Sequence, residues 1–311
     1  MGKIYEKFLK DAQSFISIRS VSPNVDCSDE IKKAAEWYVK YLESAGLYVE
    51  STSDPNPIIF AEYISDPDLE TVLLYGHYDV MPAQLSDGWE SDPFTLTERN
   101  GRLYGRGIAD DKGQLLIHTK VILDLIRKNK LKYNIKFLVE GSEEIGSSGL
   151  PDYISKNREK LSTNKILISD GSFPGRPLIT ASFRGVFNTK IKVTTAKNNV
   201  HSGTNGGIVP NAAEELSEIL AQIKDSNEAM IPGFYDDDTK PTTRELMRCR
   251  EMDCERISTL DDNEFKKIFS GKYGSFSAEA GFRTMFTITG LKSGYIDAVS
   301  YTHLTLPTKR I

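Results

Sequence analysis

Hydrophobic positions between residues 31 and 168 follow two different spacings. Apolar residues recur at helical intervals from Ile31 to Leu42, which predicts a helix with Gly46 as a candidate C-cap. A mostly apolar stretch from Leu115 to Ile126 predicts another helix. Short apolar runs bounded by turn residues predict buried strands at residues 58–60, 72–75, 135–139 and 166–168. Helices that alternate with fully apolar strands are typical of an α/β domain, with a mostly parallel sheet flanked by helices.

The spacing changes after about residue 186. The elements expected there are a half-exposed strand at 187–195, a helix at 211–224, an acidic loop at 236–262 and a strand at 282–288. An antiparallel sheet with helices on one side would suit this pattern. We therefore expect a first domain over residues 1–186 and a second, α+β domain over residues 187–298.

Composition and charge narrow the class of protein. The 39 Lys and Arg residues against 44 Asp and Glu residues give a net charge of −5, which argues against a nucleic-acid-binding protein. The 39% of hydrophobic and 27% of charged residues are typical of a soluble globular chain. No apolar run is long enough to span a bilayer. No apolar h-region follows the first lysine, so we expect no signal peptide in these residues. Three cysteines suit a reducing compartment, so we expect a cytoplasmic protein without a membrane partner.

Acidic and histidine residues gather where the predicted strands end. These positions are His77 and Asp79 after the strand at 72–75, Glu143 and Glu144 after 135–139, Asp170 after 166–168, and Asp110-Asp111 before the helix at 115–126. In a parallel sheet these carboxyl ends open onto one edge, which is where α/β proteins bind their ligands.

One histidine with several carboxylates suits a zinc ion, and two ions sharing a carboxylate would activate water and polarise a carbonyl. The spacing of His77 and Asp79 suits an aspartate that holds the imidazole by its other nitrogen. Adjacent Glu143 and Glu144 cannot face the same way on an extended backbone, so one could ligate while the other acts as a base.

Each of these features alone has an ordinary explanation, such as a helix N-cap, a turn or a solvated face. Their joint occurrence at strand and helix boundaries is what predicts a metal site. Two other histidines have simpler explanations by position. We expect His201 to be a loop histidine in the second segment and His118 to be a structural residue of the apolar helix.

Several motifs together resemble the M20 family of metallopeptidases, nearest its carnosinase and cytosolic non-specific dipeptidase branch. The motifs are YGHYDVMPA at 75–83, DGW at 87–89, DPF at 92–94, LYGRGIADDKG at 103–113, EGSEEIGS at 140–147, SD at 169–170 and HSG at 201–203. The resemblance extends from about residue 5 to about residue 298.

The resemblance implies a role for each matching residue. His77, Asp110 and Asp170 would hold one zinc, and Asp110 would bridge to a second zinc that Glu144 also binds. The other implied roles are Glu143 as general base, Asp79 orienting His77, and His201 stabilising the oxyanion in the partner subunit's site. The Asp110–Asp111 peptide would be cis.

The resemblance also implies a fold and an activity. The catalytic domain would carry an inserted lid and dimerisation domain, and the chain would form a homodimer. It would bind two zinc ions per subunit, with Mn2+ or Co2+ as possible replacements, and hydrolyse dipeptides or short peptides. The alternatives are an amidohydrolase of the N-acyl-amino-acid or succinyl-diaminopimelate type, and a non-catalytic metal-binding fragment.

Two family features have no match in this sequence: the last histidine ligand, and a lid arginine that binds the substrate carboxylate. Residues 299–311 do not resemble the family, and His303 has the wrong surroundings for the missing ligand. We therefore expect a C-terminally truncated chain, with an incomplete catalytic domain at 1–186, an incomplete lid at 187–298 and an artefactual tail at 299–311. Weak binding of the second zinc, impaired turnover and an exposed strand edge would follow.

Overall fold

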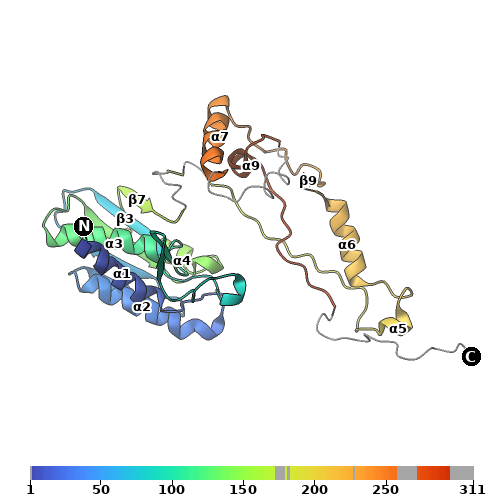
Figure 1. The fold of residues 1–311 in the computed structure, drawn as a ribbon, viewed down its shortest axis with the longest axis horizontal. Helices are drawn as coiled ribbons and strands as arrows, with labels where there is room; N and C mark the ends of the chain where they lie inside the picture. The colour runs from blue at the N-terminus through green and yellow to red at the C-terminus, as the bar shows by residue number, and fades with distance from the viewer. Residues whose placement is uncertain (1, 172–178, 181–182, 227, 258–271, 295–311) are drawn as a thin grey trace, which may run out of the picture. The chain divides into compact units, whose positions relative to one another are not determined.

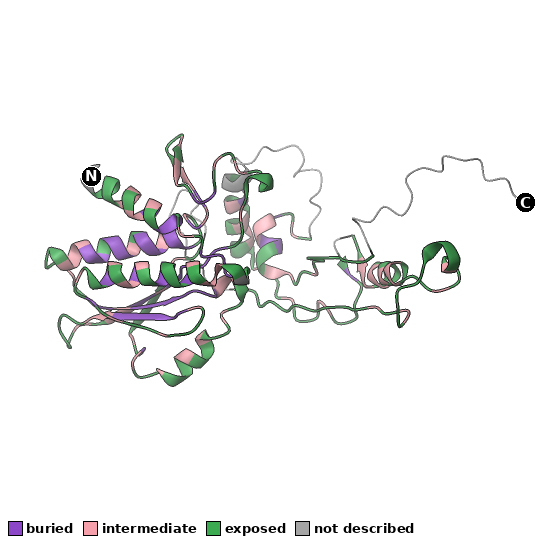
Figure 2. Cartoon of the chain, turned by 90° about the horizontal axis from the view of Figure 1, so that it is seen from below, coloured by how far each residue is buried: buried purple, intermediate pink, exposed green. Residues whose placement is uncertain are grey.

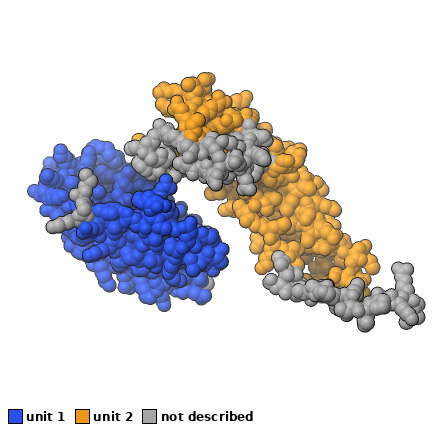
Figure 3. Space-filling model, in the orientation of Figure 1, with its two compact units in different colours: residues 1–173 blue, residues 174–311 orange. Residues whose placement is uncertain are grey.

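The computed structural model describes residues 2–171, 179–180, 183–226, 228–257 and 272–294 (Figure 1). They belong to two compact units, residues 1–173 and residues 174–311 (Figure 3). The domain division at 186/187 stays a prediction, and the proposed tail at 299–311, with His303, lies outside the described residues. No helix in these described ranges has the length and apolarity needed to cross a membrane.

A five-stranded sheet with the order β1-β2-β6-β3-β7 forms the centre of the first unit. Its strands are β1 (Tyr48–Ser51), β2 (Ile59–Tyr63), β3 (Thr71–His77), β6 (Asn134–Glu140) and β7 (Lys165–Ile168). Strands β6, β3 and β7 pair in parallel, whereas β2 pairs antiparallel with both β1 and β6. Each of the four predicted strands is therefore confirmed, and the carboxyl ends of β3, β6 and β7 lie at one edge.

Helices cover both faces of this sheet (Figure 2). They are α1 (Gly2–Ile16), α2 (Ser28–Glu43), α3 (Lys112–Arg127) and α4 (Leu150–Lys156). Side chains alternate along the strands: Leu74 and Phe137 pack with α1, α2 and α3, while Leu73 and Leu138 pack on the opposite face with α4. The two helices predicted from apolar spacing are thus confirmed as α2 and α3. The predicted C-cap of α2 is wrong: Ser44 is the C-cap, and Gly46 lies two residues further on with φ +85°.

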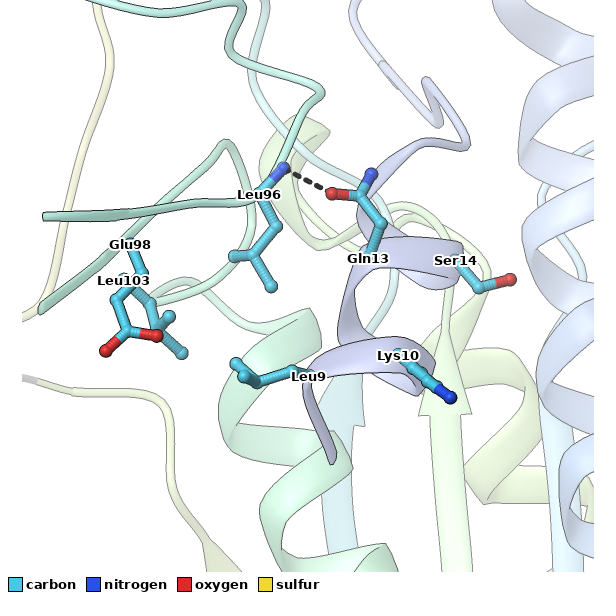
Figure 4. A pocket seen from close by; sticks show the side chains of 7 residues that line it. All are labelled: Leu9, Lys10, Gln13, Ser14, Leu96, Glu98 and Leu103. Carbon is cyan, nitrogen blue, oxygen red and sulfur yellow. Dashed lines mark hydrogen bonds between the residues drawn. The ribbon is translucent and has the colours of Figure 1, made fainter. Parts of the chain in front are cut away.

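Shorter elements complete the first unit. They are the 3-10 turns η1 (Val25–Cys27), η2 (Leu85–Asp87) and η3 (Glu143–Ile145), and the hairpin of β4 (Thr97–Arg99) and β5 (Arg102–Tyr104). A surface groove between α1 and this hairpin is lined by Leu9, Leu96 and Leu103, and Gln13 Oε1 accepts a 2.9 Å hydrogen bond from the Leu96 N–H (Figure 4). None of the predicted metal ligands lines this groove.

The strand β7 forms as predicted but is not buried. Ile166, Leu167 and Ile168 are 63%, 42% and 56% exposed. The reason is position: β7 is the edge strand and pairs only with β3 among the described residues. The expectation of an exposed strand edge agrees with this finding.

The regular elements described in the second unit are mostly helices, separated by long stretches without regular structure. Its elements are α5 (Ser202–Asn205), α6 (Ala212–Ile223), β8 (Lys224–Asp225), β9 (Glu228–Ala229), α7 (Thr243–Ile257) and α9 (Phe276–Phe282). The predicted helix at 211–224 is confirmed as α6, whose N-cap Asn211 accepts a hydrogen bond from the Ala213 N–H through its side chain.

The two strands predicted for this unit are wrong within the described residues. Residues 187–195 and 283–288 form no strand, and β8–β9 is the antiparallel pair that is present. Alternating side chains favour a strand only where a neighbouring strand accepts its backbone hydrogen bonds, and no such neighbour pairs with these segments here.

The stretch predicted as a loop at 236–262 instead contains α7 (Thr243–Ile257), and residues 258–262 lie outside the described residues. A capping box begins this helix: Glu245 Oε2 accepts from the Thr242 N–H and hydroxyl, and Thr242 Oγ1 accepts from the Glu245 N–H. The T-x-x-E spacing of Thr242 and Glu245 could have predicted the start of this helix. The helix was missed because its sequence is mostly polar and shows no clear apolar periodicity.

Candidate metal centre

Three predicted ligands converge at the carboxyl edge of the sheet. His77 ends β3, Asp110 precedes α3, and Asp170 follows β7. One ligand atom from each lies within 4.8 Å of the other two. His77 Nε2 is 3.0 Å from Asp110 Oδ1 and 3.6 Å from Asp170 Oδ2. The parallel register explains this, because Ile168 pairs with Tyr75 and the next two residues bring Asp170 level with His77.

The ring of His77 is fully buried and has two distinct sides. Its Nδ1 lies 3.0 Å from the backbone oxygen of Asp79 and 3.4 Å from Asp79 Oδ1. With a cation bound, the ring would keep its proton on Nδ1, donate it to Asp79, and present the Nε2 lone pair to the cation between Asp110 and Asp170.

The electrostatics of the cluster favour a positive charge. Burial alone would lower the pKa of His77, but hydrogen bonds to Asp170 and Asp79 and the surrounding negative charge outweigh it and raise the pKa to about 11. Among the described residues, Asp110, Asp170 and Glu143 each lie within ion-pair distance of the same basic group, the His77 ring. An imidazole nitrogen among carboxylate oxygens is a donor set that fits a divalent cation such as zinc.

The carboxylate of Asp79 connects the histidine to the neighbouring turn. Although it is fully buried, it accepts three hydrogen bonds. Asp79 Oδ2 accepts from the Ser22 hydroxyl at 2.6 Å and from the Glu144 N–H at 3.1 Å, and Oδ1 accepts from the Glu143 N–H at 3.1 Å. Asp79 therefore holds both the His77 ring and the turn that carries the two glutamates.

Glu143 and Glu144 begin the 3-10 turn η3 rather than lying on an extended backbone. Glu143 Oε2 is 4.0 Å from His77 Nε2, whereas Glu144 is outside the three-residue cluster of described ligands. Burial raises the pKa of both carboxyls, and the negative charges of Asp170 and Asp110 add to the effect at Glu143 and Glu144 respectively. A raised pKa moves a carboxylate towards the range useful for a general base. The role of Glu144 as a ligand stays a prediction.

The Asp110–Asp111 peptide is cis, as the family resemblance implied. Asp111 occupies the N-cap position of α3, but its side chain makes no capping hydrogen bond and instead accepts from the His77 N–H at 3.2 Å. Burial raises the pKa of Asp111 to about 8. A Cβ at Gly76 would lie 2.6 Å from Asp111 Oδ2 and would displace this carboxyl.

Sequence reasoning missed the role of Lys112. Its side chain is buried, and Nζ donates to the backbone oxygens of Phe15 at 3.1 Å and Ile18 at 2.7 Å. Burial lowers its pKa to about 7. The residue thus attaches the beginning of α3 to the end of α1, and nothing in the sequence pattern indicated that contact.

Two other histidines, His118 and His201, lie within the described residues and away from the cluster. His201 is the N-cap of α5 in the second unit, exposed, with Nδ1 accepting from the Gly203 N–H at 3.0 Å. Its action in a partner subunit's site is untested. His118 is half-buried on α3, where burial lowers its pKa.

Known proteins resemble this chain in sequence and in fold. Residues 73–244 match peptidase family M20/M25/M40. The Beta-Ala-His dipeptidase of Mus musculus is 36% identical over 218 residues, 68% of this chain and 44% of that protein. The Cys-Gly metallodipeptidase dug1 of Schizosaccharomyces pombe is 34% identical over 267 residues, 76% of this chain and 55% of that protein. The crystal structure of the M20 family metallo-carboxypeptidase Sso-CP2 from Sulfolobus solfataricus has a TM-score of 0.71 at 27% identity, over 94% of this chain and 67% of that one.

The chain spans about half the length of the curated relatives it matches. Its central sheet flanked by helices agrees with the solved relative, which confirms the predicted fold class. The matched residues make up more than half of the 311-residue sequence. This chain belongs to peptidase family M20/M25/M40.

Proposed function

We propose that this chain is a zinc-dependent peptidase that hydrolyses dipeptides or short peptides, with Glu143 as the general base. One observation carries the proposal: the Nε2 atom of His77 faces carboxylate oxygens of Asp110 and Asp170, with Glu143 Oε2 4.0 Å away. A cation among these ligands would have a base within reach of a water molecule beside it.

His77, Asp110 and Asp170 would hold one ion, and Asp110 with Glu144 would hold a second, so that a complete site contains two zinc ions, or Mn2+ or Co2+ in their place. When bound, such ions polarise a carbonyl and lower the pKa of water. Glu143 would take the proton from the attacking water and pass it to the leaving amine. The Asp79 carboxylate, which accepts hydrogen bonds from the Glu143 and Glu144 N–H groups, keeps this turn in position.

The relatives support the substrate class, because their names specify Beta-Ala-His and Cys-Gly dipeptides. We further propose a cytoplasmic homodimer formed through residues 187–298, in which His201 stabilises the oxyanion of the other subunit's site. In this proposal residues 1–186 belong to the catalytic domain, and turnover by the 311-residue chain is slow because the second ion has only two identified ligands, Asp110 and Glu144.

Hydrolysis assays on the purified chain test the proposal. The chain is incubated with zinc and either a dipeptide such as Cys-Gly or an N-acetyl amino acid, and Glu143→Gln is assayed beside it. We expect zinc-dependent dipeptide hydrolysis that falls by at least ~100-fold in Glu143→Gln while bound zinc is retained.

Other outcomes select the alternatives. Faster hydrolysis of N-acyl amino acids or N-succinyl-diaminopimelate would assign an amidohydrolase instead. Bound zinc with no hydrolysis of either class would favour a non-catalytic metal-binding fragment. Full activity in Glu143→Gln would contradict the assignment of the base.

A further inference from the structure

Two of the three clustered ligands, Asp110 and Asp170, lie in solvent-exposed segments that are not held in place by packing in the core. The Asp110 side chain is 59% exposed, whereas that of His77 is fully buried. Asp170 follows β7, whose last residue, Ile168, pairs with Tyr75 of β3 and is 56% exposed. The distance between the Asp110 and Asp170 carboxylates therefore depends on something other than the packed core.

One side chain joins the two segments. Gln114, in the first turn of α3, donates from Nε2 to the backbone oxygen of Ala109 and, at 3.1 Å, to that of Gly171. Its Oε1 accepts from the Ser169 hydroxyl at 3.1 Å. These partners are direct neighbours of the two aspartates: residue 109 precedes one, and residues 169 and 171 flank the other.

The chemistry of glutamine suits this position. Two backbone carbonyls can only accept hydrogen bonds, so the amide must turn its NH2 group towards them, which leaves its oxygen for the Ser169 hydroxyl. The short reach from a rigid helix turn gives the three bonds a fixed geometry. Neither a carboxylate nor an aliphatic side chain at residue 114 reproduces both donations.

We propose that Gln114 is a positioning residue that sets the spacing of the Asp110 and Asp170 carboxylates, and thereby the affinity of the site for a divalent cation. The affinity part rests on the proposed metal site, whereas the contact between the two loops does not. Gln114 itself holds no ion and touches no ligand atom; it acts through the backbone on either side of the ligands.

Amide hydrogen exchange tests the positioning directly. Gln114→Met removes all three hydrogen bonds at similar side-chain volume, and Gln222→Met, at an exposed glutamine of α6, is the matched control. We expect faster exchange confined to peptides that cover residues 107–111 and 167–171, with the core strand β3 unchanged. Gln114→Glu, which cannot donate, should behave like Gln114→Met and keeps the test valid if the methionine variant folds poorly. Unchanged exchange in either loop would overturn the proposal.

Cobalt binding tests the consequence. Co2+ is titrated into the wild-type chain and the variants, and its visible absorption reports the coordination sphere. We expect about tenfold weaker Co2+ binding in Gln114→Met and wild-type binding in Gln222→Met. Ser169→Ala should weaken binding less, and should add nothing in the Gln114→Met background. Equal affinity of Gln114→Met and wild type would overturn the proposal. Absence of Co2+ binding in the wild-type chain would refute the metal site instead, and the exchange data would still decide the role of Gln114.

Discussion

The substitution Asp79→Asn tests whether the Asp79 carboxylate organises the site. The change keeps the size of the side chain but removes its charge and replaces one acceptor oxygen with a donor. Asp79 Oδ2 serves the Ser22 hydroxyl and the Glu144 N–H, so the asparagine carbonyl should face them. Its NH2 group would then face the Glu143 N–H, which loses its acceptor.

The magnitude follows from these three hydrogen bonds. A hydrogen bond to a charged group contributes about 1.5–3 kcal/mol and a neutral one about 1 kcal/mol. Two bonds weaken and one is lost, while the neutral amide costs less to bury than the carboxylate. We expect the free energy of unfolding of the first unit to fall by about 2–3 kcal/mol. Ser22→Ala, which removes one of the three bonds, should cost about half as much.

Tryptophan fluorescence during urea unfolding measures this cost. The chain has two tryptophans, Trp37 and Trp89, and both lie in the first unit, so the signal reports on the unit that contains Asp79. Asp54→Asn, at an exposed aspartate, is the control for loss of charge. A urea midpoint equal to that of wild type in Asp79→Asn, together with unchanged amide exchange at Glu143, would refute the reasoning.

Two further predictions concern packing and pH. A Cβ at Gly141 would lie 2.4 Å from Tyr78 Oη, so Gly141→Ala should lower the thermal midpoint by an amount equivalent to about 1–3 kcal/mol. Gly149→Ala is the control and should leave the midpoint unchanged, because the nearest contact of its Cβ would be at 3.9 Å. Equal midpoints of the two variants would contradict the packing around Gly141. Burial lowers the pKa of His118 from 6.5, so the unfolded chain takes up a proton before the folded one and stability falls as the pH drops below about 6.5. His118→Gln should therefore lose less stability than wild type between neutral pH and about pH 5.5, and an equal loss in urea midpoint would contradict the assignment.

The sequence pattern predicted the core of the fold well because burial is periodic there. The runs that became β2, β3 and β6 are apolar on both faces and lie between helices. The strand β1 was missed because three of its four residues are exposed, which leaves no apolar run. A strand also needs a neighbouring strand for its backbone hydrogen bonds. Apolar and polar residues alternate along 187–195 as in a strand, but this segment pairs with no strand among the described residues, so no strand forms there.

At the site, residues that follow parallel strands could be predicted to converge. The pairing of β3 with both β6 and β7 determines where His77 and Asp170 lie. The supporting residues could not be predicted, because their contacts join segments far apart in sequence. Ser22 contacts Asp79, and Lys112 contacts the backbone of Phe15, in each case through folding of the whole unit.

Zinc binding by the 311-residue chain and by ligand variants tests the central claim most directly. The account predicts one tightly bound zinc per chain, measured after desalting, and a second that binds weakly because Asp110 and Glu144 are its only identified ligands. His77→Ala and Asp170→Ala should each abolish the tight ion, whereas Glu143→Gln should retain it. Tight zinc that survives the loss of His77 and Asp170, or no zinc in the wild-type chain, would contradict the account.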